Sequence, residues 1–455
     1  MNIKEKFHLY RKAGVLTFSF LLFFAISFTC CKENEDTQFV VSPPDPSIET
    51  KISTYYPDSG GVATSLILRG TNFGTDTSYL KVYVNGKKAA IVGCDGEAIY
   101  AIVPSRADSG EVKLVVGKDT ELKNFVYENH FKYFFRENVT TVCGQNGIGG
   151  IDDGDANTAT LRRPWNIAFD NDGVLFFVDE GRGQNSDGGL RKYIDGNVET
   201  IMRCSGGVLQ SPTALAFNLG QDTLFLIQTI YNVNNLSTDA AISYLTRNEG
   251  FSVIKPYVRT SLTFRSTGIA VHPITGDIFF NSRADGYIYK VIKSTGGYNK
   301  LFQINGTDTE VRMAFDPQGK YLYMIVQNKH CIYRAEFNES TREVENPELF
   351  AGQWGVYGFL NGIGSAAMFD QPGQGTFDED GNLYIPDKYN HCVRKITPNG
   401  MVSTFAGKAG EYGYKDGSPL ESMFNQPECV MYNPADRGWY VADRENSLIR
   451  KILVE

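Results

Sequence analysis

Short stretches in which apolar and polar residues alternate fill the chain between residues 47 and 128. Examples are SLILRG, KVYVNG, KAAIVG, AIYAIVP and EVKLVVG, and Gly, Asn and Asp residues separate them. A period of two is typical of β-strands with one buried face, and these separating residues favour tight turns. Residues 47–128 are therefore predicted to form one small β-sandwich.

Residues 129–455 repeat one pattern six times. Each unit has an apolar strand, a turn containing Asp or Gly, and a second strand, and a third and fourth strand such as HCVRKI and MVSTFAG follow. Four strands per unit at a spacing of roughly 44 to 62 residues is the size of a propeller blade. The six paired segments are RPWNIAFDNDGVLFFVD, SPTALAFNLGQDTLFLI, STGIAVHPITGDIFFNS, EVRMAFDPQGKYLYMIV, QPGQGTFDEDGNLYIPD and QPECVMYNPADRGWYVAD.

The ends of the repeat region indicate how the ring closes. The last unit stops at Ile452–Glu455 without its fourth strand, whereas Val139–Gly144 precedes the first unit and matches the fourth strand Val402–Gly407. We therefore expect 139–144 to complete blade six. The fold class predicted for the chain is all-β, a sandwich followed by a six-bladed β-propeller.

The N-terminus has the pattern of an export signal. A basic stretch and the apolar run Val15–Phe28 lead to Cys30 and Cys31. Cysteine at this place resembles the lipobox of bacterial lipoproteins, and the acidic residues after Cys31 resemble an export tag for the outer face of a Gram-negative outer membrane. We expect a signal peptide over 1–30, lipidation of Cys31 or else Cys30, and a tether over 31–46. The alternative is a plain secretory signal or an uncleaved anchor.

Specific motifs link both regions to known families. The succession YPDSGG, LILRGTNFG, VNG, VP and GEV over residues 56–112 resembles the IPT/TIG family of immunoglobulin-like domains. The repeats, with DKYN at 387–390 and DREN at 443–446 before an Arg-Lys-Ile triplet, resemble NHL repeats. These resemblances imply an IPT/TIG sandwich over 47–128 and an NHL-type propeller over 129–455.

Charge and residue types narrow the function. The formal net charge is −8, which disfavours the RNA-binding role that some NHL proteins have, so no nucleic-acid partner is expected. The cysteines after the signal show no zinc-ligand spacing, and no nucleophile motif is present, so no catalytic residue, metal or cofactor is assigned. The acidic loop with Asp152, Asp153 and Asp155 is a weak candidate for a structural cation, and Asp179, Asp387 and Asp443 are predicted to cap blade turns.

Propeller families bind ligands on the face where the innermost strands begin. The residues expected there include Trp165, Asn166, Arg312, Gln374 and Glu428. Propeller lactonases and lyases hold a metal at this place with several carboxylates or histidines, whereas the corresponding positions here supply one carboxylate, Glu428, and no histidine. A lyase or hydrolase function is therefore the less favoured hypothesis.

Three interblade segments, 144–164, 352–372 and 407–427, share one length and the same landmarks. The second and third carry aromatic residues, which can stack on the apolar faces of sugar rings while amides and arginines bind the hydroxyls. Alternatively, these aromatics pack onto adjacent blades as covers for the core. The residues of this candidate ligand site are Trp354, Tyr357, Phe359, Tyr412, Tyr414, Trp165, Asn166, Arg312, Gln374, Asn425, Gln426 and Glu428.

The sequence thus favours a non-enzymatic cell-surface lipoprotein that binds an extracellular ligand on the propeller face. A glycan is the leading ligand, by fold-level analogy with surface lipoproteins of glycan-foraging bacteria. The alternative is a protein–protein adhesion or scaffold role. The membrane is expected to be a partner only through the lipid anchor.

Overall fold

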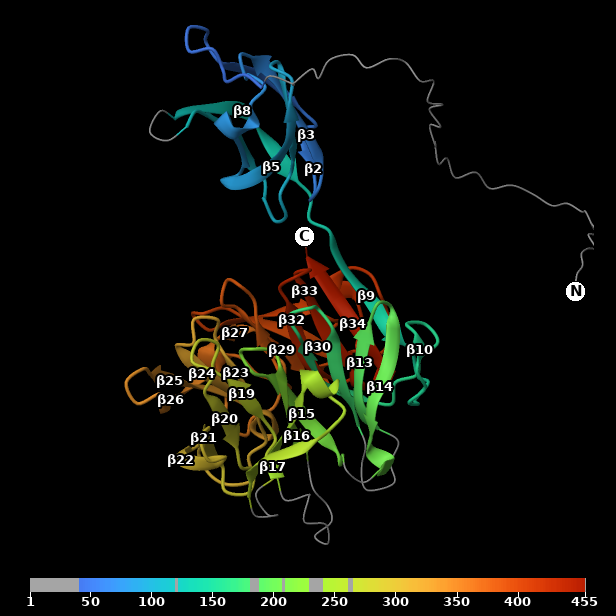
Figure 1. Ribbon diagram of the computed structural model, residues 1–455. Coiled ribbons are helices and arrows are strands. Elements are labelled where there is room, and N and C mark those ends of the chain that lie inside the picture. Colours follow the sequence, from blue (N-terminus) through green and yellow to red (C-terminus); the bar gives the residue numbers. More distant parts are fainter. Residues whose placement is uncertain are drawn as a thin grey trace, which may run out of the picture.

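The computed structural model describes residues 41–118, 122–180, 188–206, 209–228, 240–260 and 265–454. The predicted signal peptide, both candidate lipidation cysteines and most of the tether lie outside these ranges. Within the described ranges, no helix has the length and apolar character needed to cross a membrane. The two regions expected from the sequence are both built from strands (Figure 1).

The first domain is a β-sandwich whose strands are hydrogen-bonded in the order β1-β3-β6-β5-β4-β7-β8-β2. β5 pairs with β6 on one side and with β4 on the other, so it joins the two layers. Alternate residues such as Leu66, Leu68, Val82 and Leu114 are buried between the layers, as the period of two predicts. The strands are β1 Lys51–Tyr56, β2 Ser59–Gly60, β3 Ser65–Thr71, β4 Leu80–Val84, β5 Lys87–Cys94, β6 Ala98–Ile102, β7 Gly110–Val116 and β8 Lys123–Tyr133.

Six antiparallel sheets form the propeller, one per sequence unit. Blade one has β11 Pro164–Phe169, β12 Leu175–Asp179, β13 Gly189–Ile194 and β14 Asn197–Arg203, with β10 Gly154–Asp155 on its outer edge. Blades two and three have β15 Pro212–Phe217, β16 Thr223–Gln228, β17 Ala240–Thr246 and β18 Lys255–Arg259, then β19 Ile269–Val271, β20 Ile278–Asn281, β21 Tyr287–Ile292 and β22 Gly297–Gln303.

Blade four has β23 Val311–Phe315, β24 Tyr321–Val326, β25 Cys331–Asn338 and β26 Glu343–Gly352. Blade five has β28 Thr376–Phe377, β29 Leu383–Asp387, β30 Cys392–Ile396 and β31 Met401–Ala406, with β27 Gly362–Ile363 on its outer edge. Blade six has β32 Pro427–Asn433, β33 Gly438–Asp443, β34 Leu448–Val454 and β9 Glu137–Gly144. Single 3₁₀ turns are η1 Thr77–Tyr79, η2 Cys204–Gly206, η4 Arg247–Glu249, η5 Gln327–Lys329, η6 Gly364–Ala366, η7 Lys388–Asn390, η8 Pro419–Glu421 and η9 Arg444–Asn446.

The ring closes as the sequence predicts. β9 precedes blade one in the chain but pairs antiparallel with β34, from Leu448 opposite Gly144 to Val454 opposite Glu137. Joining the two ends of the propeller region in one sheet gives blade six its fourth strand.

β9 also fixes which face of the propeller the first domain meets. It begins beside Val454 and ends at Gly144, and the chain then continues to the start of β11, so the innermost strands begin on the opposite face. Figure 1 shows the first domain at the end of the propeller where β9 begins. The face where propeller families bind ligands therefore points away from the first domain.

Among the described residues, two hydrogen bonds and one cation–π contact link the two domains. The Arg106 Nε atom donates a hydrogen bond to the Val454 carbonyl oxygen at 3.1 Å, and its guanidinium lies 5.3 Å from the centre of the Trp439 ring. Arg437 donates to the Ser105 hydroxyl at 2.7 Å.

β8 continues to Tyr133, five residues beyond the expected boundary, because its last residues pair with β7 and β2.

Candidate functional site at the channel mouth

A pocket of about 410 Å³ opens on the face where the innermost strands begin. Its wall combines residues at the starts of the inner strands with residues that directly follow the second strand of a blade. Five blades contribute to it, so only the closed ring assembles it. The lining residues are Trp165, Glu180, Ser211, Pro212, Thr213, Arg265, Thr267, Arg283, Glu310, Arg312, Gln327, Gln371 and Lys388.

Trp165 is the large flat side chain of this pocket. Cationic groups of three other blades surround its ring at 5.0 to 5.9 Å, namely those of Arg312, Lys388 and Arg444. The Trp165 Nε1 atom is buried and has no hydrogen-bond partner among the described residues. Trp165 therefore contributes to the pocket an aromatic ring held among cations, with a buried Nε1 donor that no described residue accepts.

A buried carboxylate lies behind the pocket wall. Glu428 accepts a hydrogen bond from Gln327 at 2.8 Å and pairs with Lys388 at 2.8 Å and Arg312 at 3.5 Å. Burial alone raises the pKa of Glu428, but the charges of Lys388 and Arg312 outweigh it and hold that pKa below its ordinary value. Glu428 is thus an ionised anchor for two pocket cations and is itself almost inaccessible.

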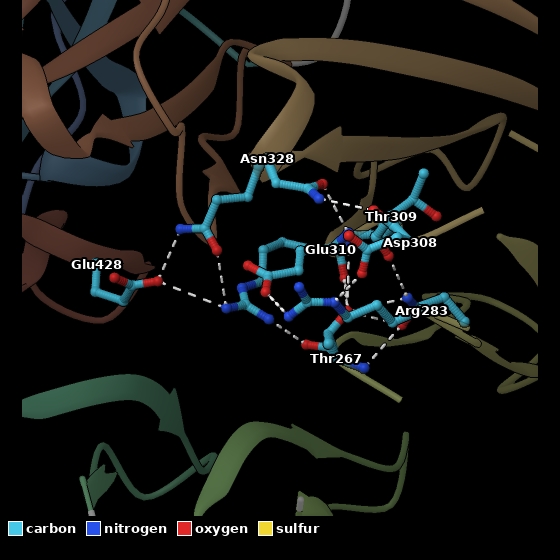
Figure 2. Close-up of polar contacts among 11 residues, drawn as sticks. Thr267, Arg283, Asp308, Thr309, Glu310, Asn328 and Glu428 are labelled. Carbon is cyan, nitrogen blue, oxygen red and sulfur yellow. Dashed lines mark hydrogen bonds and ion pairs between the residues drawn. The ribbon is translucent and has the colours of Figure 1, made fainter. Parts of the chain in front are cut away.

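The opposite wall carries two further arginines. Arg283 pairs with Asp308 at 2.7 Å and with Glu310, as Figure 2 shows. Arg265 lines the pocket and is exposed, and neither a hydrogen bond nor an ion pair ties its guanidinium to another described residue.

The remaining polar residues expected at the site lie elsewhere. Asn166 and Gln374 line a separate cavity of about 280 Å³. There Asn166 accepts a hydrogen bond from the Leu215 amide, and Gln374 donates to the Met313 carbonyl, so both bridge neighbouring blades. Asn425 and Gln426 flank the pocket face, and their backbone amides donate to Asp443 and to the His391 Nδ1 atom.

The aromatic residues of the interblade segments are outside the pocket lining and divide into two groups. Phe359 lies 4.6 Å from the Arg394 guanidinium and Tyr414 lies 5.0 Å from that of Arg450, so each covers a buried arginine. Trp354 is half-buried against Tyr333 and the blade core. These three side chains act as covers for the blades.

Tyr357 and Tyr412 are different because they are 68% and 70% exposed. Tyr357 contacts the His330 ring, and His330 Nδ1 accepts a hydrogen bond from the amide of Gln371, a pocket residue. Tyr389, also exposed, follows Lys388 of the pocket wall, and its ring is 5.5 Å from that ammonium group. Exposed tyrosines therefore border the pocket on the side of blade five.

Three buried ion pairs hold the equal-length interblade segments in place. Asp179 pairs with Arg191, Asp387 with Arg394 and Asp443 with Arg450, at 2.6 to 3.0 Å and with no exposed surface. Each arginine also donates to two carbonyl oxygens of the preceding segment, for example Met368 and Leu360 in blade five. The turn-capping role expected for these aspartates is wrong for Asp387 and Asp443, because neither side chain caps the turn that follows it. They orient an arginine that holds the segment, and they accept hydrogen bonds from the Asp370 and Asn425 amides.

The acidic loop expected as a weak cation site is occupied by internal contacts. Asp153 pairs with Arg191 and accepts from Thr200, Asp155 accepts from Thr158, and Asp152 accepts from Thr160. Across the described ranges, no group of three or more His, Cys, Asp or Glu side chains is placed to hold a metal ion. The cysteines from Cys94 to Cys429 are all free thiols.

Comparison with known proteins agrees with this architecture. Residues 50–133 match the IPT/TIG domain family. Residues 50–133 are an IPT/TIG domain. Human NHL repeat-containing protein 2 is 31% identical over 102 residues, which are 22% of this chain and 14% of that protein. The chain therefore spans about one seventh of that relative's length.

Two solved structures resemble nearly the whole chain, including the IPT/TIG domain. An auxiliary nutrient binding protein from Bacteroides thetaiotaomicron is 29% identical, with a TM-score of 0.64, over 91% of this chain and 99% of that one. An auxiliary nutrient binding protein from Bacteroides ovatus is 27% identical, with a TM-score of 0.65, over 91% of this chain and 100% of that one. The pairing of an IPT/TIG domain with a propeller is thus shared with binding proteins.

Sequence reasoning missed a second ring of channel residues. It identified the starts of the inner strands, on the face away from the IPT/TIG domain, but not the residue that follows each second strand. The repeat contains the signal, because this residue comes directly after Asp179, Asp387 and Asp443 in three blades. The residues of the second ring at the pocket are Glu180, Gln327, Lys388 and Arg444, and in blade three Arg283 lines the pocket one residue further along the chain.

Proposed function

We propose that this protein is a non-enzymatic surface lipoprotein that binds an extracellular carbohydrate at the mouth of its propeller channel. The observation that carries the proposal is the channel-mouth pocket, in which Trp165 and polar side chains from several blades converge. A sugar presents apolar C–H faces and many hydroxyls, and an aromatic ring with fixed donors and acceptors complements both.

The exposed tyrosines extend this surface. Tyr357 and Tyr389 lie beside the pocket wall formed by Gln371 and Lys388, and the exposed Tyr412 contacts the His391 ring. A chain-like ligand with one unit in the pocket would continue over these rings, because flat aromatic faces stack on successive sugar units. The similarity to auxiliary nutrient binding proteins supports a ligand that serves as a nutrient.

The proposed anchoring explains why the site lies where it does. A lipid on Cys31 and the tether over 31–46 would attach the chain to the outer membrane at the end of the IPT/TIG domain. Because the pocket opens on the opposite face of the propeller, it would be held away from the membrane and towards the medium. Mass spectrometry of the N-terminal peptide from the native host tests the lipid, and the outcome against it is an unmodified Cys31 and Cys30.

A carbohydrate array followed by calorimetry tests the binding proposal. Trp165→Phe removes the Nε1 donor, and Tyr357→Ala and Tyr412→Ala remove exposed rings, while Tyr100→Ala in the IPT/TIG domain is the matched control. We expect saturable binding that all three site variants weaken at least about fivefold and that the control leaves unchanged. Absence of binding to every host and dietary carbohydrate would remove the proposal.

One observation favours a second candidate, a protein adhesion or scaffold role. The segment 352–372 exposes Val356, Leu360 and Ile363 beside Tyr357, and apolar side chains grouped at a surface are typical of protein contacts. Leu360→Glu and Ile363→Glu should abolish binding of a protein partner at this segment. The same substitutions should leave carbohydrate binding in the channel-mouth pocket intact.

A further inference from the structure

The geometry points to a ligand that carries one oxyanion group, a carboxylate or a sulfate ester on a sugar unit, with Arg265 as the residue that binds it. This inference rests on the proposed carbohydrate-binding function and narrows the class of carbohydrate. It follows from how the charges around the pocket are paired.

Most cations at the pocket already have carboxylate partners. Lys388 and Arg312 share Glu428, and Arg283 has Asp308 and Glu310. Arg444 and Arg163 share Glu180 and Glu445. With Arg265 included, six cations of the described residues face five carboxylates in these pairs, which leaves one positive charge in excess among them.

Arg265 is the cation that carries this excess. It lies in the pocket wall and is exposed, and no hydrogen bond or ion pair links its guanidinium to another described residue. The hydrogen bond from Arg283 at 2.7 Å is the main cause that lowers the pKa of Asp308, and the charge of Arg265 contributes to the same shift without pairing with that carboxylate. A planar guanidinium with free donors is suited to a carboxylate, which it can bind through two parallel hydrogen bonds.

The neighbouring donors favour the same ligand. Lys388 uses one ammonium hydrogen for Glu428 and has others to donate, and the buried Trp165 Nε1 atom lacks an acceptor among the described residues. Oxyanion oxygens accept several hydrogen bonds at once, so one such group would satisfy donors that a single sugar hydroxyl leaves unpaired. The single excess charge further indicates one acidic unit per pocket rather than a densely charged polyanion.

The test compares three oligosaccharide pools in calorimetry on the purified full chain. They are galacturonic acid oligomers, galactose oligomers of the same length, and the same galactose oligomers carrying sulfate esters. Arg265→Ala removes the cation and Arg265→Lys keeps the charge without the planar fork. Arg69→Ala, an exposed arginine of the IPT/TIG domain, is the control for the change in net charge.

We expect at least one acidic pool to bind about tenfold or more tightly than the neutral pool. Arg265→Ala should abolish that preference, Arg265→Lys should retain part of it, and Arg69→Ala should retain all of it. Tighter binding of the uronic acids identifies a carboxylate, and tighter binding of the esters identifies a sulfate.

Equal affinity for neutral and acidic pools, or a preference that survives Arg265→Ala, overturns the oxyanion inference while the carbohydrate-binding proposal stands. If none of the three pools binds, and the protein also binds nothing on the wider carbohydrate array, the proposed carbohydrate-binding function itself is contradicted. The two failures are therefore distinguishable.

Discussion

The guanidinium of Arg312 and the carboxylate of Glu428 lie 3.5 Å apart although they belong to blades four and six, which are not neighbours in the ring. Lys388 of blade five binds the same carboxylate at 2.8 Å. Glu428 therefore ties three blades together behind the pocket wall. Both Glu428 and Arg312 are almost fully buried, so water does little to screen this network.

Glu428→Gln should destabilise the propeller. Removing one partner of a buried ion network leaves its cations uncompensated, which costs about 3–5 kcal/mol. Urea unfolding measures the loss, and Glu339→Gln, an exposed glutamate of blade four, is the control that should change nothing measurable. An unfolding midpoint for Glu428→Gln equal to that of the wild type would show that the network contributes no net stability.

Arg394→Met should be far more damaging than the same substitution at a surface pair. Arg394 is fully buried with Asp387, so its loss leaves a buried carboxylate and frees segment 352–372, at a cost of about 3–5 kcal/mol. Arg334 pairs with Glu348 at a partly exposed site, and Arg334→Met should cost less than about 1 kcal/mol. Thermal unfolding of both variants measures the stability that each loses. Equal losses in Arg394→Met and Arg334→Met would contradict the structural role of the buried pair.

The contact between His330 and Gln371 should depend on pH. Burial lowers the pKa of His330 despite the opposing influence of Asp370, and Lys329 lowers it further. Because the folded pKa is below the unfolded value, the neutral ring stabilises the fold above about pH 6.5, and this contribution is lost as the pH falls through the folded pKa. A protonated Nδ1 atom cannot accept the Gln371 amide hydrogen.

Hydrogen exchange measures this effect directly. The Gln371 amide should exchange faster at low pH than its intrinsic rate predicts, whereas the Gly373 amide, which donates to the Pro386 carbonyl, is the internal reference. His330→Asn removes the titration and suits the left-handed backbone at this position, where φ is 58°. If protection of the Gln371 amide still depends on pH in that variant, His330 is not the group responsible.

The orientation of the IPT/TIG domain should depend on Arg106. Its contacts with Val454 and Trp439 are two of the three described between the domains. Arg106→Ala should therefore broaden the distance distribution between labels on the two domains, with little change in the stability of either. Single-molecule energy transfer reports the distribution, and an unchanged width would show that other contacts fix the orientation.

The sequence by itself determined the architecture, because strand periodicity, turn residues and repeats are local properties of the chain. The alternation in residues 47–128 indicated the sandwich, the six units indicated the propeller, and the match between Val139–Gly144 and Val402–Gly407 indicated how the ring closes. It also indicated that the starts of the inner strands face the channel, and Trp165 and Arg312 do line the pocket there.

Only the tertiary structure decided which side chains meet. Aromatic residues of one segment look alike in sequence, yet Phe359 covers a buried arginine while Tyr357 is exposed, because the fold of the segment sets the direction of each side chain. Charge pairing also depends on the tertiary structure. Arg312 pairs with Glu428, which is more than a hundred residues away in the chain, whereas no described residue pairs with the Arg265 guanidinium. Contacts between blades that are distant in sequence have no local signal, so the charge excess of the pocket emerges only once the ring is closed.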